Sequence, residues 1–311
     1  MREESMANKN SIKTKGAAKT GDQPTITVAI EQNFPKEQRI IEDNLAAQLY
    51  SGMNRFWINI TKIAILRNWI VNMTEKFLPG GWSCFLVRKR YIDERLIESI
   101  TENKIKTVVN LGAGSDTRLY RLSEAQNISA WEVDQGVNID AKRKAIEKAL
   151  GSFPINVKQV SINFINEEIE DVLKRHGYLG NEKTFFIWEA VSQYINESAV
   201  QKTFDFFSKA PVGSRLVFTY VLKDFIKGEN LYGQEWGYEK FVLKDKIWHF
   251  GFDPNQIEDY LNKNGWKLIE DIDYAELGDR YVKPTGRSLG VMDIERMVFA
   301  EIGRASCRER V

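Results

Sequence analysis

KTVVNLGAGSDTRLYRLSEAQNISAWEVDQGVNID, residues 106–140, is the stretch that decides the fold. Residues 107–111 form a short apolar run with β-branched side chains, which ends at a turn built on Gly112 and Gly114. Helical spacing follows the turn, and a second apolar run ends in Asp134. A strand, a glycine turn, a helix and a second strand closing on a carboxylate form a unit that typically holds an adenosine-containing cofactor.

The details of the turn indicate which kind of cofactor fits. Asp134 follows Gly114 by 20 residues, a separation that suits hydrogen bonds from a ribose diol to a carboxylate. A dinucleotide fingerprint needs a third glycine where this chain has Thr117, and a pyrophosphate would meet the negative charge of Asp116. The pattern therefore favours a cofactor without phosphate over nicotinamide or flavin. A tight turn that binds nothing is the alternative, and Asp116 is as suited to capping the following helix as to touching a cofactor.

Composition narrows the class of protein. The 311 residues are 43% hydrophobic and 12% aromatic, which suffices for one large α/β domain with additions or for two small domains. A formal net charge of +1 gives no indication of a nucleic-acid partner or an acidic membrane. Two cysteines, Cys84 and Cys307, exclude a disulfide framework and suit a reducing cytoplasm. No metal is expected, because neither His176 nor His249 has a partner at ligand spacing.

The two ends of the chain stand apart from the rest. Residues 1–24 are polar and lysine-rich and are predicted to be disordered, and they contain no apolar core of a signal peptide. Residues 303–311 follow a good strand and are interpreted as a non-native tail. Residues 56–87 are rich in Trp, Ile and Leu, but charged residues interrupt them, so buried helix is predicted there rather than a membrane span.

Strand and helix patterns alternate over most of the chain, which predicts an α/β fold with a doubly wound sheet. A helical N-terminal cap is expected over residues 25–104 and a core over 105–302, with a lid insertion at 222–250. The expected strands are residues 107–111, 128–133, 156–162, 184–188, 215–221, 266–272 and 294–300. Expected helices include 35–49, 85–100, 141–150, one capped by Asn196 and one that begins at Pro254.

Several motifs resemble one known family. NLGAGSDTRLYRL at residues 110–122, followed by WEVD at 131–134, is similar to the leucine carboxyl methyltransferase family of class I S-adenosylmethionine-dependent methyltransferases. The closer similarity is to the bacterial and archaeal branch that methylates small molecules. Further matches, in the family's order, are RIIEDNLA (39–46), RKRYID (88–93), IWEAVSQYI (187–195), FGFDP (250–254) and YVKPTGR (281–287).

The resemblance implies a seven-stranded, mostly parallel, Rossmann-like sheet that ends in an antiparallel hairpin, with a helical N-terminal cap. It implies S-adenosyl-L-methionine as the cofactor. Arg88 matches the family arginine that pairs with the methionine carboxylate, a task that suits a planar guanidinium. Gly112 and Gly114 match the turn beside the methionine portion, and Asp134 matches the ribose carboxylate.

The resemblance also places residues beside the adenine and the sulfonium. Asn163 and Phe164 match the adenine position, where the family usually has Asp followed by an apolar residue, and Glu189 matches the acidic residue near the ammonium and sulfonium. Asn163 would accept from the adenine without charge, and Ala190 stands where Gly is common. An ion pair with a neighbouring Glu is the alternative for Arg88, and a helix-start role is the alternative for Glu189.

Methyl transfer is an in-line displacement at a carbon that the sulfonium activates, so the protein mainly positions the reactants. A carboxylate acceptor needs no base, whereas a hydroxyl does, and His249 is then the candidate catalytic residue. Packing of His249 next to its aromatic neighbours is the alternative. Tyr194, Tyr220 and Trp236 are predicted to line the pocket of a small-molecule acceptor, although ordinary packing explains such aromatics equally well.

Three functions remain open from the sequence. The first is O-methylation of a carboxylate or hydroxyl on a small metabolite. The second is a nucleotide-dependent oxidoreductase, against which Asp116 and Thr117 count. The third is a module that binds S-adenosylmethionine without catalysis. A cytoplasmic location with no nucleic-acid or membrane partner is expected in each case.

Overall fold

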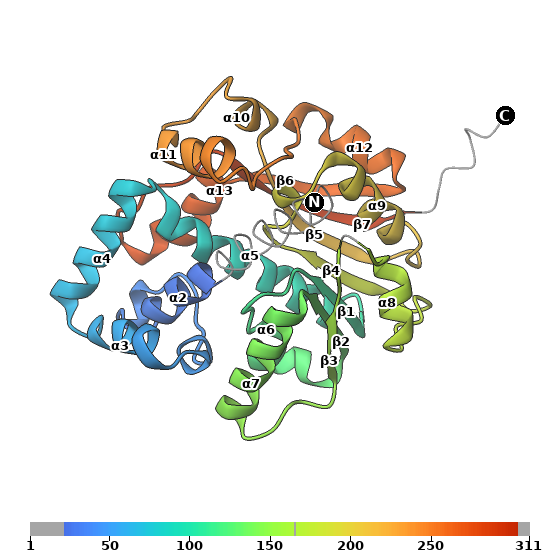
Figure 1. Cartoon of the computed structure of the whole chain (residues 1–311), viewed down its shortest axis with the longest axis horizontal. Helices are drawn as coiled ribbons and strands as arrows, with labels where there is room; N and C mark the ends of the chain where they lie inside the picture. Colours follow the sequence, from blue (N-terminus) through green and yellow to red (C-terminus); the bar gives the residue numbers. More distant parts are fainter. Residues whose placement is uncertain (1–21, 165, 304–311) are drawn as a thin grey trace, which may run out of the picture.

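The computed structural model describes residues 22–164 and 166–303. Four helices precede the sheet: α2 (Asp22–Glu31), α3 (Gly52–Ile60), α4 (Ala64–Phe77) and α5 (Gly81–Thr101), with the short turns η1 (Lys36–Gln38) and η2 (Ala46–Leu49). Figure 1 shows α2, α3 and α4 to one side of the strands, with α5 between them and the sheet. The first helices thus form a layer that reaches past the edge of the sheet.

A seven-stranded sheet forms the centre, in the order β3-β2-β1-β4-β5-β7-β6. β1 to β5 pair in parallel, whereas β7 is antiparallel to both β5 and β6. The sequence prediction of a doubly wound, mostly parallel sheet ending in an antiparallel hairpin is confirmed. The strands are β1 (Thr107–Leu111), β2 (Ser129–Asp134), β3 (Val157–Ser161), β4 (Thr184–Trp188), β5 (Arg215–Val221), β6 (Trp266–Asp273) and β7 (Glu295–Ile302).

Helices connect the strands and cover both faces of the sheet (Figure 1). Those of the core are α6 (Arg118–Arg121), η3 (Ser123–Asn127), α7 (Gly136–Leu150), α8 (Ile169–Arg175), η4 (Ser192–Tyr194), α9 (Glu197–Phe207), η6 (Pro254–Gln256) and α12 (Ile257–Lys263). The segment between β5 and α12 contains α10 (Lys223–Lys227), α11 (Glu235–Gly237) and the π-helix η5 (Tyr238–Lys244). The segment between β6 and β7 contains α13 (Tyr274–Leu277), η7 (Gly278–Val282) and η8 (Lys283–Thr285).

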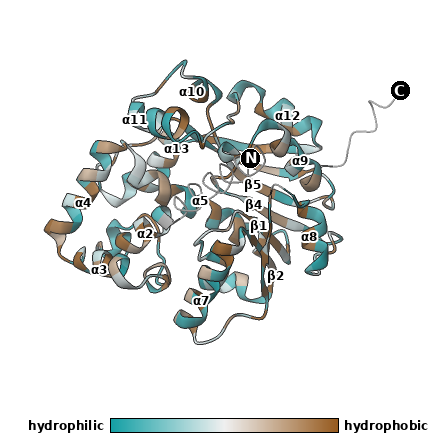
Figure 2. Ribbon diagram, viewed as in Figure 1, coloured by the Kyte–Doolittle hydropathy of each residue, from teal (hydrophilic) through white to brown (hydrophobic). Residues whose placement is uncertain are grey.

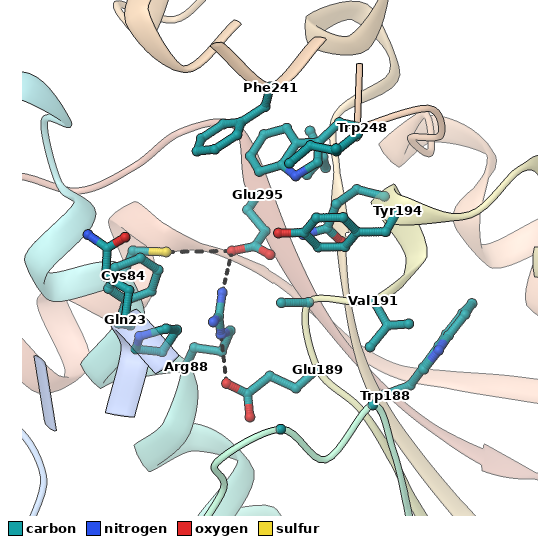
Figure 3. A pocket seen from close by; sticks show the side chains of 18 of the residues that line it. Gln23, Cys84, Arg88, Trp188, Glu189, Val191, Tyr194, Phe241, Trp248 and Glu295 are labelled. Carbon is teal, nitrogen blue, oxygen red and sulfur yellow. Dashed lines mark hydrogen bonds and ion pairs between the residues drawn. The ribbon is translucent and has the colours of Figure 1, made fainter. Parts of the chain in front are cut away.

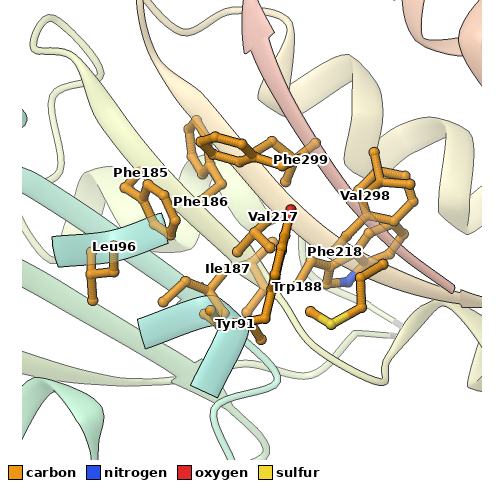
Figure 4. Close-up of a cluster of buried hydrophobic side chains, with 14 of the residues drawn as sticks. Tyr91, Leu96, Phe185, Phe186, Ile187, Trp188, Val217, Phe218, Val298 and Phe299 are labelled. Atoms are coloured by element: carbon orange, nitrogen blue, oxygen red, sulfur yellow. The ribbon is translucent and has the colours of Figure 1, made fainter. Parts of the chain in front are cut away.

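The core is organised around β4, whose five residues TFFIW are all buried. Successive side chains of a strand point to opposite faces, so β4 serves both layers. On one face the rings of Phe186 and Trp188 contact Phe204 and Phe207 of α9. On the other face α5 packs against β4 and β5. Figure 4 shows these apolar side chains gathered along the central strands.

A buried ion pair fixes α7 on the sheet. Lys142 Nζ donates to Glu132 Oε1 at 2.7 Å, and both side chains are almost fully buried. Burial raises the pKa of Glu132, and the charge of Lys142 offsets that shift in part. Lys142 Nζ also donates to Ala113 O at 3.4 Å, so the same side chain joins α7 to β2 and to the turn after β1.

One predicted helix does not form. Residues 35–49 contain only the turns η1 and η2, with extended chain between them. The backbone N–H groups of Leu45 and Ala46 donate to the Asp43 carboxylate, and that of Ile40 donates to Glu31. These side-chain acceptors compete with the i−4 carbonyls that a helix would use. The apolar spacing was therefore misread as helical.

Other boundaries also shift. Disorder was predicted up to residue 24, but helix α2 already begins at Asp22. Pro24 lies in its first turn, where a proline is tolerated. Helix α7 starts at Gly136 rather than at Ala141. Residues 1–21 and all of the predicted tail 303–311 except Gly303 lie outside the described residues. Within the described ranges, every helix is too short or too polar to cross a bilayer.

The Lys142–Glu132 pair gives the first prediction. We expect Lys142→Met to lower the free energy of unfolding by about 3–5 kcal/mol, because it leaves a buried carboxylate without its cation. With Lys142 absent, the pKa of Glu132 in the folded chain lies still further above its unfolded value. The loss of unfolding free energy in Lys142→Met, relative to wild type, is therefore smallest at about pH 4 and grows as the pH rises.

Denaturant unfolding of wild type and variant across this pH range measures the effect. Lys144→Met is the matched control, because Lys144 lies on the exposed side of the same helix. The control should stay within about 0.5 kcal/mol of wild type. Equal losses in the two variants would contradict the role given to the buried pair.

Candidate active site

The glycine turn after β1 is held in a left-handed conformation that glycine adopts most readily. Gly112 has φ 74° and Gly114 has φ 42°. A Cβ on Gly112 would lie 2.4 Å from Cγ2 of Val191, in the loop after β4. The N–H of Gly112 donates to Val133 O at 2.8 Å, which ties the turn to β2. Any side chain at Gly112 would displace the neighbouring loop.

Asp134 lies at the carboxyl end of β2 and is fixed by three donors. Its Oδ2 accepts from Gly114 N at 2.7 Å, and its Oδ1 accepts from Gln135 N at 2.6 Å and from Asn138 Nδ2 at 2.7 Å. A carboxylate offers about four acceptor positions, so these bonds leave capacity for a ligand hydroxyl. The turn and the carboxylate thus form one rigid unit.

A large cavity opens above this unit. Its volume is about 1230 Å³, larger than the roughly 300–1,000 Å³ of ordinary small-molecule sites. The walls come from the ends of β1, β2 and β4, from α4 and α5, and from the segment between β5 and α12. Its lining includes Arg88, Lys89, Gly112, Gly114, Asp134, Phe164, Glu189, Tyr194, Trp236, Phe241, Trp248, His249 and Glu295.

Arg88 on α5 lies at the centre of a buried ion cluster (Figure 3). Its Nε donates to Glu189 Oε1 at 2.9 Å, and its Nη1 donates to Glu295 Oε2 at 3.0 Å. Glu295 Oε2 also accepts from Tyr274 Oη at 2.8 Å and from Cys84 Sγ at 3.5 Å. Burial opposes the charge on Arg88, but the two carboxylates outweigh it and raise the pKa of the guanidinium. Burial raises the pKa of the Cys84 thiol, so the thiol stays protonated.

A second arginine completes the cluster on the other side of Glu189. Arg118 Nη2 donates to Glu189 Oε2 at 2.9 Å, and Arg118 Nε lies 2.9 Å from Asp116 Oδ2. Lys89 Nζ lies 3.5 Å from Glu189 Oε1 and 4.0 Å from Asp116 Oδ2. Burial alone would raise the pKa of both carboxyl groups, yet the nearby cations outweigh it and lower the pKa of Glu189 and of Asp116. Both groups are therefore ionised.

Asp116 also holds the start of α6, whose N-cap residue is Thr117. Its Oδ1 accepts from the backbone N–H of Arg118 at 2.8 Å. The hydroxyl of Thr117 donates to Asp43, next to the same helix start. An ionised, buried carboxylate at this place would repel a pyrophosphate.

The structure brings most of the predicted site residues to the one cavity. Arg88, Gly112, Gly114, Asp134, Phe164, Glu189, Tyr194, Trp236 and His249 all line it. Asn163 does not: it is exposed, its backbone N–H donates to Glu167, and it is absent from the cavity wall. The prediction that Arg88 meets a ligand carboxylate stays a prediction, because its two bonds in this structure go to protein carboxylates.

Tyr220 was wrongly predicted to line the acceptor pocket. Its side chain is fully buried, it packs against Phe218 and Phe252, and its hydroxyl donates to Asp271 at 3.1 Å. The next residue, Val221, lines the cavity instead. Neighbouring residues of a strand face opposite ways, so an error of one position moves a side chain from the site into the core.

A search against family models matches residues 23–208 to the family described as leucine carboxyl methyltransferase. The chain belongs to the leucine carboxyl methyltransferase family. Two relatives bear the name "Putative S-adenosyl-L-methionine-dependent methyltransferase". One, from Mycolicibacterium smegmatis, is 26% identical over 191 residues, which cover 60% of this chain and 62% of the relative. The other, from Mycobacteroides abscessus, is 29% identical over 203 residues, which cover 59% and 67%. The chain thus spans about two thirds or less of these relatives.

Solved structures support the fold. A "putative methyltransferase" from Thermobifida fusca superimposes with a TM-score of 0.55 at 14% identity, over 76% of this chain and 88% of that one. A DUF574 family protein from Streptomyces avermitilis gives a TM-score of 0.53 at 12% identity, over 76% and 90%. At such identities the similarity concerns the fold alone.

Two kinds of cavity residue escaped the sequence reasoning. Lys89 and Glu295 belong to the ion cluster, and Trp69, Met73 and Phe77 of α4 form part of the wall. Lys89 follows the family-matched arginine directly, which was a usable signal. Glu295 was expected only as a strand residue, and nothing local distinguishes it. The spacing of four residues along α4 was visible but was interpreted as buried helix.

No metal site emerges beside the ion cluster. In residues 22–164 and 166–303, no group of three or more His, Cys, Asp or Glu side chains is arranged to hold a metal ion. The carboxylates of the cluster face arginine and lysine instead. The site is organised for charge pairing with cations of the protein.

Ala190, directly after Glu189, adopts a left-handed conformation with φ 54°. Its N–H donates to Thr219 Oγ1 at 2.8 Å, which holds the backbone there. The left-handed region costs a residue with a Cβ roughly 1–2 kcal/mol. We therefore expect Ala190→Gly to raise the free energy of unfolding by about 0.5–1 kcal/mol, after the entropy cost of glycine.

Denaturant unfolding compares this variant with Ala141→Gly, where the same exchange occurs inside the regular helix α7. The control should lose about 1 kcal/mol. If both exchanges destabilise the protein, the strain assigned to Ala190 is absent.

Proposed function

We propose that this protein is an S-adenosyl-L-methionine-dependent methyltransferase that methylates an oxygen atom of a small molecule. One observation carries the proposal: the glycine turn and Asp134 open into a cavity whose volume of about 1230 Å³ exceeds what one ligand needs. The names of the two mycobacterial relatives and the family membership support the same cofactor.

The residues present fit this cofactor. Gly112 lacks a Cβ and so leaves room for Val191 beside the turn that lines the cavity, and Asp134 has acceptor capacity for ribose hydroxyls. Phe164 is half-exposed on the cavity wall and offers an apolar surface to the adenine. Lys89 is held less closely by protein carboxylates than Arg88, so its ammonium suits the methionine carboxylate together with that arginine. When bound, the cofactor supplies a methyl group on a sulfonium.

Charge balance favours an amino-acid moiety in the cluster. The cations Arg88, Lys89 and Arg118 face the carboxylates of Asp116, Glu189 and Glu295. Arg118 also lies 3.7 Å from the carboxylate of Asp93, which pairs with Arg121 as well. A zwitterion brings one charge of each sign, so it exchanges partners with the cluster without leaving a buried charge unpaired. Glu189 is ionised and is thereby suited to an ammonium or sulfonium group.

The oxygen acceptor is favoured by the family and by the apolar part of the cavity. The matching family is described as a carboxyl methyltransferase. A carboxylate is already ionised and needs positioning and removal of water, which Phe85, Tyr194, Phe241 and Trp248 provide as apolar walls. A nucleotide-dependent oxidoreductase is disfavoured by the ionised Asp116 at the helix start.

The cofactor assignment is tested by calorimetric titration of S-adenosyl-L-methionine. We expect Asp134→Asn to raise the dissociation constant at least about tenfold, because it replaces a charged acceptor of the ribose hydroxyls. Asp140→Asn on the exposed side of α7 is the control and should bind as wild type does. A folded wild type that does not bind would end the methyltransferase proposal; binding without turnover of any acceptor would indicate a non-catalytic module.

His249 separates the two acceptor chemistries. It lines the cavity, and its backbone N–H donates to Gln193 O at 2.7 Å. For carboxylic acids we expect His249→Gln to change the rate of S-adenosylhomocysteine formation less than about tenfold, since no proton is removed. His176→Gln, at the residue directly after α8, is the control. A loss of about 10²–10⁴, together with turnover of phenols or alcohols alone, would instead make His249 the base.

A further inference from the structure

The cavity is polar at one end and apolar at the other. Its floor, at the ends of the strands, carries Arg88, Glu189 and Glu295, whereas its roof carries Phe241 and Trp248, which stack with ring centroids 4.7 Å apart. Figure 3 shows these two rings on the opposite side of the cavity from Glu189, with Tyr194 between them. A ligand that fills both regions has a polar head and an apolar body.

The apolar wall does not end at the cavity mouth. Helix α4 carries Ile65, Trp69, Met73 and Phe77, four residues apart, which places them along one face of the helix. The last three line the cavity, and Ile65 continues the row outward. The opposite face of α4 is the buried one, with Arg67 and Val71 inside the protein. The row Ile65–Trp69–Met73–Phe77, called here the α4 stripe, is a path from the cavity to the surface.

The side chains of the α4 stripe are apolar and yet largely exposed to solvent. Ile65 is 80% exposed, Trp69 58% and Phe77 53%. Figure 2 shows hydrophobic colouring along α3 and α4 at the margin of the molecule. A continuous row of large apolar side chains at a surface marks a binding surface.

We infer that the methyl acceptor is an amphiphile with an oxygen-bearing head and a long hydrocarbon chain that lies along the α4 stripe. The inference rests on the proposed function and names its substrate class. The head sits at the polar floor, beside the cofactor, and the chain passes Phe77, Met73 and Trp69 towards Ile65. A lone pair of the carboxylate oxygen forms the bond to the methyl carbon, and the electrons of the breaking carbon–sulfur bond stay on sulfur. The products are a methyl ester and S-adenosylhomocysteine.

The test is a chain-length series. Calorimetric titrations with butyric, octanoic and dodecanoic acids, in the presence of S-adenosylhomocysteine, are run beside methyl-transfer assays with S-adenosylmethionine. Each methylene that reaches the apolar wall should tighten binding about two- to fourfold, so affinity and kcat/KM should rise steeply from butyric to dodecanoic acid. Ile65→Ser should flatten the rise for dodecanoic acid only, because shorter chains do not reach that position.

Ile63→Ser is the matched control. Ile63 is also an exposed isoleucine, but it precedes α4 and lies off the stripe. Ile63→Ser should show the same increase of affinity with chain length as wild type. An affinity that does not depend on chain length, or equal effects of the two variants, would overturn the inference while leaving the proposed function intact, provided that S-adenosylmethionine still binds. Failure of wild type to bind S-adenosylmethionine would overturn the proposed function itself.

Sedimentation of wild type and Ile65→Ser distinguishes another occupant of the stripe. A monomer in both samples is the expected result. A dimer of wild type that dissociates on Ile65→Ser would show that a second copy of the chain covers the stripe, which would also overturn the inference.

Discussion

The guanidinium of Arg88 joins three segments that are far apart in the sequence. It lies on α5, and its two hydrogen bonds reach Glu189 after β4 and Glu295 on β7. Removing such charges from water costs several kcal/mol per ion, so the cluster is stable only because each charge finds an oppositely charged partner. This requirement fixes how the N-terminal helices sit on the sheet. Arg118 and Lys89 extend the same network around Glu189.

The position of α5 determines the shape of the site. Helix α5 is held against β4 and β5, and the chain passes from α4 into α5 at Gly80, whose φ of 72° only glycine adopts readily. A Cβ there would lie 2.2 Å from the backbone of Val291. The segment between β5 and α12 then closes the space from the other side with Trp236, Phe241 and Trp248. A polar floor under an apolar roof follows from this arrangement, so the cavity has one charged end and one apolar end.

Local patterns predicted much of the framework. Strand β4 has the predicted bounds, Asn196 caps α9 through its bond to Ala199 N, and Gly151 ends α7 in a left-handed conformation. Each of these features depends on a few consecutive residues, so a short stretch of sequence is enough to predict it. The predicted helix over residues 35–49 does not form, because Asp43 and other side chains accept hydrogen bonds from the backbone N–H groups. Apolar spacing does not reveal that competition. The prediction for Tyr220 failed because consecutive side chains of a strand point to opposite faces of the sheet.

The sequence by itself determined the glycine turn, the carboxylate of Asp134 at the end of the second strand and the alternation that builds the sheet, because each arises from residues that are neighbours in the chain. Only the tertiary structure decided that Glu295 meets Arg88 and that Trp69 and Phe77 border the same cavity as Gly112. These contacts join parts of the chain that lie up to 207 residues apart. Such distant partners are selected by the packing of α5 and by the pairing of buried charges, and no short stretch of sequence records either of them.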